Sequence, residues 1–193
     1  MPVTAFRTPT DVRGVFQSHP RRALIITTLR SESRAVKAHL TNPELLVGEK
    51  SELYEVGRFA DPAGEWFIVH AITLQGNNNA GLAVSQAYYE FGAFEAQLFV
   101  GVAGSLKGDI PIGSVVVGEY VYNGHSAKVE DTATLARPHA MPASRLLITA
   151  SQALIYSDNW QDLIRPPSGM PLPEVSKYPC KFPPDATIKG IVS

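Results

Sequence analysis

The sequence has little cysteine, no excess of charge of one sign and no long hydrophobic run. Its single cysteine, Cys180, excludes an internal disulfide bond and a zinc site built from cysteines. The 17 Lys and Arg residues nearly balance the 18 Asp and Glu residues, so the basic excess needed for extended contacts with nucleic acid is missing. No apolar run reaches the ~20 residues that cross a bilayer, and residues 1–20 lack the apolar core of a signal peptide. We therefore expect a cytoplasmic protein that binds neither nucleic acid nor membrane.

Patterns for metal and cofactor binding are missing as well. The five histidines are scattered, and none forms a pair at helix or hairpin spacing with an acidic residue that would complete a ligand set. The pair Gly101 and Gly104 lacks the third, helix-opening glycine of a dinucleotide-binding fingerprint. The sequence thus predicts no metal, no cofactor and no Rossmann dehydrogenase.

What is present is the pattern of an α/β domain. The 193 residues, 45% of them hydrophobic and 18% charged, suffice for one core, which we assign to residues 21–193 after a leader of residues 1–20. Apolar runs without alternation, typical of strands covered on both faces, alternate with segments of helical periodicity. The expected strands are residues 23–28, 53–59, 66–72, 97–104, 112–122 and 186–192, and the expected helices are 31–40, 79–94 and 143–156. Seven prolines predict a long loop over residues 165–184.

Candidate site residues lie at or just after the carboxyl ends of three of the expected strands. They are Glu32, Gly76, Asn77, Val102, Ala103 and Gly104. Each has an ordinary structural explanation, since a glutamate or asparagine at a helix start is usually a capping choice, and a Gly-x-x-Gly after a strand is usually a tight turn. Together they are more informative, because the carboxyl ends of parallel strands share one edge of a sheet, where ligands bind.

In their order and spacing these segments resemble the nucleoside phosphorylase/nucleosidase superfamily, in particular 5′-methylthioadenosine/S-adenosylhomocysteine nucleosidases. The segments that carry the resemblance are residues 25–32, 76–80, 99–106, 112–117, 121–122 and 188–193. The resemblance implies a three-layer α/β/α phosphorylase-like fold with a central mixed, mostly parallel sheet. It also implies self-association into a homo-oligomer, since members of the family form dimers or larger rings.

The activity implied by the resemblance is cleavage of the N-glycosidic bond of a purine nucleoside through an oxocarbenium-like transition state. Glu32 resembles the glutamate that orients and deprotonates the attacking water. Val102, Ala103 and Gly104 resemble the loop that lines sugar and base. Gly76, with its neighbour Asn77, resembles the turn that faces the ribose or phosphate.

The chain departs from the family pattern in two places. Ser114 stands where the family commonly has an aspartate, and the family's Met-Glu pair and purine-protonating aspartate follow the strand that ends here at Ser193. We therefore expect a C-terminally incomplete domain that is inactive as a nucleosidase by itself.

Three functions remain open at this stage. Residues 27–30 lack the Gly-Asp-Pro turn with which many phosphorylases bind phosphate, which favours hydrolysis by a nucleosidase. The alternatives are a phosphate-dependent purine nucleoside phosphorylase and a catalytically inactive nucleoside-sensing or interaction module of a larger protein.

Overall fold

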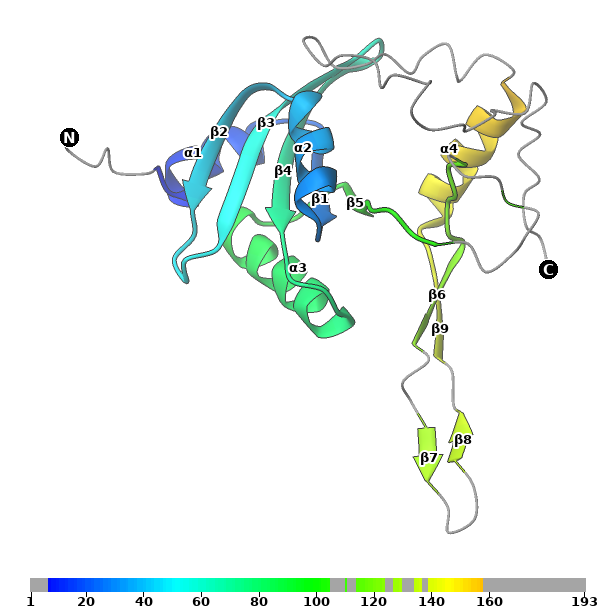
Figure 1. Cartoon of the computed structure of the whole chain (residues 1–193). Helices are drawn as coiled ribbons and strands as arrows, with labels where there is room; N and C mark the ends of the chain where they lie inside the picture. Colours follow the sequence, from blue (N-terminus) through cyan, green and yellow to red (C-terminus); the bar gives the residue numbers. More distant parts are fainter. Residues whose placement is uncertain are drawn as a thin grey trace, which may run out of the picture. The chain divides into compact units, whose positions relative to one another are not determined.

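The computed structural model describes residues 7–104, 110, 114–123, 127–129, 134–136 and 139–157 (Figure 1). The chain divides into two compact units, unit 1 with residues 1–104 and unit 2 with residues 105–193. Within the described part of the chain, no helix is both long enough and apolar enough to span a membrane.

Unit 1 is a mixed α/β domain, as the sequence predicts. In chain order its elements are α1 (Pro9–Ser18), β1 (Arg22–Thr27), α2 (Arg30–Ala38), β2 (Thr41–Val47), β3 (Leu53–Asp61), β4 (Gly64–Ile72), α3 (Asn77–Phe91) and β5 (Ala96–Phe99). The strands form one five-stranded sheet in the order β2-β3-β4-β1-β5. β1 pairs parallel with β4 and β5, whereas the pairs β2–β3 and β3–β4 are antiparallel. The sheet is therefore mixed, and the expected predominance of parallel pairs is not found among these strands.

Most elements of unit 1 lie where the sequence predicts them. β1, α2, β4 and α3 are confirmed, and so is the hairpin that joins β3 to β4. The expected strand over residues 97–104 is shorter, because regular pairing ends at Phe99. α2 begins one residue before the expected helix of residues 31–40, and Leu29 occupies its N-cap position.

Two elements of unit 1 were not predicted. α1 lies within the segment that we expected to be a leader; its first turn is capped by Asp11, whose Oδ2 accepts a hydrogen bond of 2.7 Å from the Thr8 amide. β2 begins directly after the helix expected over residues 31–40, where no strand was expected, and it contains Asn42 and Pro43, which are unfavourable in a regular strand. The strand accommodates them with Asn42 at φ 50° and a shift of register between Thr41 and Glu44.

The two faces of the sheet are packed differently, because successive strand residues point to opposite sides. Leu24 and Ile26 of β1 belong to a large apolar cluster with α1 and α3. At its centre the ring of Phe16 meets those of Phe67, Phe91 and Phe94 edge-on, at centroid distances of 5.3, 5.6 and 5.2 Å. The face toward α2 has a smaller apolar cluster and carries buried polar side chains.

Unit 2 contains two short antiparallel strand pairs and one helix in its described residues. β6 (Tyr120–Asn123) pairs with β9 (His139–Pro142), and β7 (Ala127–Val129) with β8 (Thr134–Ala136). α4 (Arg145–Tyr156) confirms the helix expected over residues 143–156. Of the strand expected over 112–122, residues 114–118 have no regular structure and β6 begins at Tyr120, while residues 112 and 113 lie outside the described residues. Cys180, the loop 165–184 and the strand 186–192 lie outside the described residues.

Candidate functional site

The candidate site lies at the edge of the sheet where three parallel strands end. The register pairs Thr27 of β1 with Ile72 of β4, and Ile26 of β1 with Phe99 of β5, so the carboxyl ends of these strands are side by side. The segments that follow them contain all six candidate residues. This edge is where open α/β sheets commonly bind ligands.

Glu32 joins two of these segments. Its Oε2 accepts hydrogen bonds from the backbone amides of Leu29 (2.8 Å) and Thr28 (3.0 Å) and from the Thr28 hydroxyl (3.3 Å). Its Oε1 accepts a hydrogen bond of 2.9 Å from the amide of Val102. One carboxylate therefore binds both the turn between β1 and α2 and the loop that follows β5.

These bonds also determine the charge of Glu32. The side chain is nearly buried, yet the bond from the Leu29 amide, followed by that from Val102, lowers the pKa of the carboxyl below its usual value because both stabilise the ionised form; burial opposes them. Glu32 is therefore a carboxylate at neutral pH. An ionised carboxylate oxygen offers about two acceptor directions, and in the described contacts Oε1 uses one, for Val102.

The neighbouring Gly101 makes this contact possible. A Cβ atom at Gly101 would lie 3.0 Å from Oε1 of Glu32, closer than side-chain carbons normally approach an oxygen. By contrast, a Cβ atom at Gly104 would have no atom within 4 Å. A side chain at Gly101 would therefore press against the Glu32 carboxylate, while Val102, Ala103 and Gly104 are exposed and open to contact from solvent.

Gly76 and Asn77 lie in the turn between β4 and α3, at the same edge of the sheet. Gly76 is the N-cap of α3 and has φ 111°, a conformation that favours glycine. Asn77 is the first helical residue and is exposed, and the expected asparagine cap is not formed, because Asn79 donates instead to the carbonyl of Gln75 (2.8 Å). Among the hydrogen bonds of the described residues, only that between Glu32 and Val102 joins two of the candidate residues.

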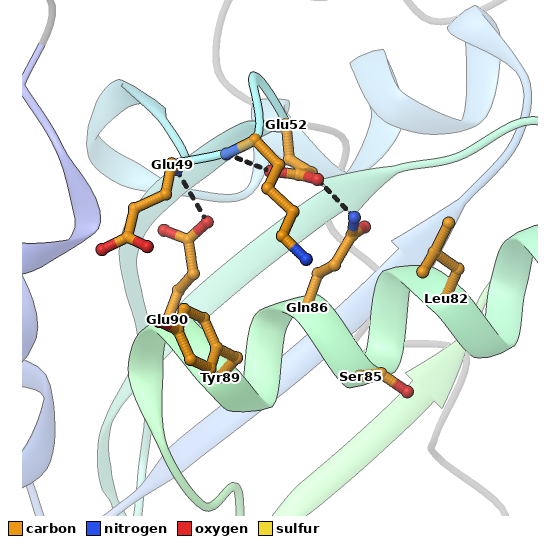
Figure 2. Close-up of a pocket in the computed structure, with 8 residues that line it drawn as sticks. Glu49, Glu52, Leu82, Ser85, Gln86, Tyr89 and Glu90 are labelled. Atoms are coloured by element: carbon orange, nitrogen blue, oxygen red, sulfur yellow. Dashed lines mark hydrogen bonds between the residues drawn. The ribbon is translucent and has the colours of Figure 1, made fainter.

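A pocket of about 190 Å³ lies elsewhere, between α3 and the turn that joins β2 to β3 (Figure 2). Glu90 points from α3 toward this turn and accepts a hydrogen bond of 3.0 Å from the amide of Glu49, and Gln86 donates to Glu52. Burial is the main cause that raises the pKa of Glu90, and the neighbouring carboxylates add to it. None of the six candidate residues lines this pocket.

Sequence reasoning missed a line of polar side chains on the face of the sheet toward α2. The Thr27 hydroxyl lies 2.9 Å from Nε2 of His70, whose Nδ1 lies 3.2 Å from Oε2 of Glu55. Lys37 of α2 binds the other oxygen of Glu55 at 2.5 Å. The only hint in the sequence is a lone histidine within the apolar strand of residues 66–72.

Comparisons with known proteins leave these sites to be interpreted from their own chemistry. No protein-family model matches the chain, and no similar protein is found among curated ones. In the part of the chain that the structure describes, no group of three or more His, Cys, Asp or Glu residues is placed to hold a metal ion.

Proposed function

We propose that unit 1 belongs to a phosphorylase-like domain that hydrolyses the N-glycosidic bond of a purine nucleoside, with Glu32 as the residue that orients the attacking water. The single observation that carries the proposal is the bridge made by Glu32 between the β1–α2 turn and the loop after β5. It brings a carboxylate to an exposed glycine-containing loop at the carboxyl edge of the sheet, the arrangement that the sequence resemblance requires.

The surroundings of Glu32 suit an acceptor better than a strong base. Because backbone amides lower its pKa, the carboxylate is ionised at neutral pH but has a weak affinity for a proton. Its role is therefore to accept a hydrogen bond from water and to hold one lone pair of that water toward the anomeric carbon. As the C–O bond forms and the C–N bond breaks, the water gives up its proton to solvent and the purine nitrogen takes up a proton from solvent. Positive charge that develops on the sugar ring in the transition state is stabilised by the same carboxylate.

The exposed backbone beside Glu32 supplies the binding groups of this proposal. Val102, with 74% of its surface exposed, and its neighbours Ala103 and Gly104 present peptide groups without regular secondary structure. Such groups can contact the sugar and base closely because little side-chain bulk intervenes. The amides at the start of α3, after Gly76, are a second polar surface at this edge, suited to a ribose hydroxyl or phosphate.

A second candidate function is nucleoside binding without cleavage, and a specific observation favours it. The carboxylate of Glu32 already accepts four hydrogen bonds from its own chain, which is the behaviour of a group that anchors a loop. In this case Glu32 shapes the binding loop and activates no water.

One experiment separates the candidates. The chain is incubated with methylthioadenosine, adenosine or inosine, with and without phosphate; base release is followed by chromatography and binding by the change in melting temperature. Release of base and free ribose sugar without phosphate supports the nucleosidase, whereas a sugar 1-phosphate formed only with phosphate identifies a phosphorylase. Because the 193-residue chain by itself is expected to release no base, the same assay on the chain completed with the C-terminal segment that the resemblance implies decides between cleavage and binding. A raised melting temperature without base release by the completed chain supports the binding function, and neither binding nor release by it would contradict both.

If base is released, Glu32→Gln tests the role of the carboxylate. We expect kcat to fall about 10²-fold or more with a small change in KM, because the amide keeps the size of the side chain but not the charge that acts in the transition state. Glu95→Gln is the matched control, since Glu95 is exposed and immediately precedes β5, at the opposite edge of the sheet. An unchanged kcat in Glu32→Gln would remove Glu32 from the reaction.

A further inference from the structure

Four polar side chains from four different elements form a continuous line under α2. Thr27 of β1 and His70 of β4 are fully buried, Glu55 of β3 is almost so, and Lys37 of α2 is half exposed. The line therefore has one end at solvent, the Lys37 ammonium group, and the other at the last residue of β1. Nothing in the proposed reaction uses it.

The acceptors and donors define the tautomer of His70. An ionised Glu55 can only accept, so Nδ1 of His70 carries the proton that points to Oε2 of Glu55. Nε2 is then unprotonated and accepts a hydrogen bond from the hydroxyl of Thr27. The ammonium group of Lys37 donates a hydrogen bond to the other oxygen of Glu55.

Hydroxyl, imidazole and carboxylate in this order also occur in nucleophilic catalysis. Here the hydroxyl oxygen of Thr27 lies in a side chain with none of its surface exposed, so it does not reach a substrate. The effect of the line must be on the protein itself.

Thr27 connects the line to the position of Glu32. Its carbonyl accepts a hydrogen bond of 2.9 Å from the amide of Thr73, which ties the end of β1 to the segment after β4. The next residue, Thr28, binds Oε2 of Glu32 through both its amide and its hydroxyl. The direction in which the chain leaves β1 is thus held by Thr27 on one side and Glu32 on the other.

We propose that His70 is a proton-sensitive positioning residue, which in its neutral form holds Thr27 and thereby keeps the β1–α2 turn in the conformation that binds the Glu32 carboxylate. When Nε2 gains a proton it becomes a donor, and the Thr27 hydroxyl can no longer donate to it. The proton of the Thr27 hydroxyl is then buried without its acceptor, which costs free energy. A movement of the β1–α2 turn removes this cost.

The charges around His70 determine when this happens. The titratable groups that act on it are Glu55 from β3 and Lys37 from α2, while β1 contributes the uncharged Thr27. Burial is the main cause that lowers the pKa of His70, the contact with Glu55 raises it, and Lys37 lowers it. The pKa of His70 therefore lies below the ordinary histidine value, so the neutral form is present at neutral pH and a pH below that value is the condition that changes the turn. The proposal stands whether or not the site cleaves nucleosides.

The test is NMR of the ¹⁵N-labelled 193-residue chain between pH 7.5 and 5. His70→Gln identifies the His70 ring signals, and the reporters are the amides of Leu29 and Val102, which both donate to Glu32. We expect the Nδ1-protonated tautomer at pH 7.5, and a fall of about tenfold or more in the exchange protection of both amides as His70 titrates. The opposite tautomer, or unchanged protection through the titration of His70, would overturn the proposal.

Two variants at Thr27 test the proposed coupling between His70 and the β1–α2 turn even if His70→Gln does not fold. Thr27→Val removes the hydroxyl at nearly the same volume, and we expect the protection of Leu29 and Val102 to lose its dependence on pH in this range. Thr27→Ser keeps the hydroxyl and should keep the dependence. If Thr27→Val responds to pH as the unaltered chain does, the coupling does not pass through Thr27 and the proposal is wrong.

Discussion

The two faces of the unit 1 sheet are both buried, one by apolar packing and the other by hydrogen-bonded polar side chains. Toward α1 and α3, Phe16, Phe67 and Phe91 fill the space with rings that meet edge-on. Toward α2, the residues Thr27, His70 and Glu55 are buried through directed hydrogen bonds. Apolar packing depends on volume and is insensitive to protons, whereas each polar contact depends on a protonation state. The comparison predicts that the stabilisation from the aromatic face is independent of pH and that the stabilisation from the polar face changes with pH.

The largest effect is expected on the aromatic face. Phe16→Ala removes a fully buried ring that contacts three other phenylalanine rings, and should lower the free energy of unfolding by about 3–5 kcal/mol. Chemical denaturation measures it. Val15→Ala on the same helix is the control, because Val15 is exposed; its effect should stay within about 0.5 kcal/mol. Equal effects of the two substitutions would mean that α1 does not form this core.

A smaller effect, specific to the polar face, is expected from acid. The pKa of His70 is lowered in the folded state from the ordinary histidine value of about 6.5, so the unfolded chain binds the proton more readily. The stabilisation is therefore complete above about pH 6.5 and is lost as the pH falls through the folded-state pKa of His70. The melting temperature should decrease from pH 7.5 to pH 5, and less so in His70→Gln.

Two carboxyl groups limit the window of this measurement. The lowered pKa of Glu32 makes it a source of further acid sensitivity only below about pH 4.5, and the raised pKa of Glu90 acts in the opposite direction near and above that value. The interval from pH 7.5 to 5.5 therefore isolates His70 best. The same decrease in His70→Gln as in the unaltered chain would assign the acid sensitivity to other groups.

The smallest effect is expected in the loop after β5, which is bound by Glu32. Gly101→Ala places a Cβ atom against the Glu32 oxygen that Val102 holds in place, and should lower the free energy of unfolding by about 1 kcal/mol. Gly104→Ala meets open space and should instead stabilise by about 0.4–1 kcal/mol through the unfolded chain. Opposite signs for the two alanines would support the Glu32 bridge, and equal signs would contradict it.

Local patterns predicted much of unit 1. β1 and β4 are short apolar runs, and α3 has helical periodicity and ends at Gly92, so neighbouring residues suffice to recognise them. β2 and α1 were not predicted from the sequence, for different reasons. Asn42 and Pro43 are unfavourable in a strand, and β2 forms because it pairs with β3. α1 is held in place because Phe16 packs against the rings of Phe91 and Phe94, which are distant in the sequence.

For the candidate site, the sequence predicted which segments lie at one edge of the sheet but not the hydrogen bonds between them. Strand order and parallel pairing bring Glu32 and Val102 to one edge, and that much follows from residues that come directly after strands. That Glu32 is held by the amides of its own chain, and that its pKa is lowered, depends on distances between backbone atoms.

The sequence by itself determined the α/β class, the approximate limits of most elements of unit 1, and a set of small and acidic residues placed after strands. These properties depend on hydrophobic periodicity and turn chemistry, which act over a few neighbouring residues. Only the tertiary structure decided the mixed pairing of the sheet and the line from Lys37 to Thr27. Glu55 and His70 become partners because the antiparallel register of β3 and β4 sets them opposite each other, and Thr27 joins them from a third strand. A register is chosen by the packing of both faces at once, so no single segment encodes it.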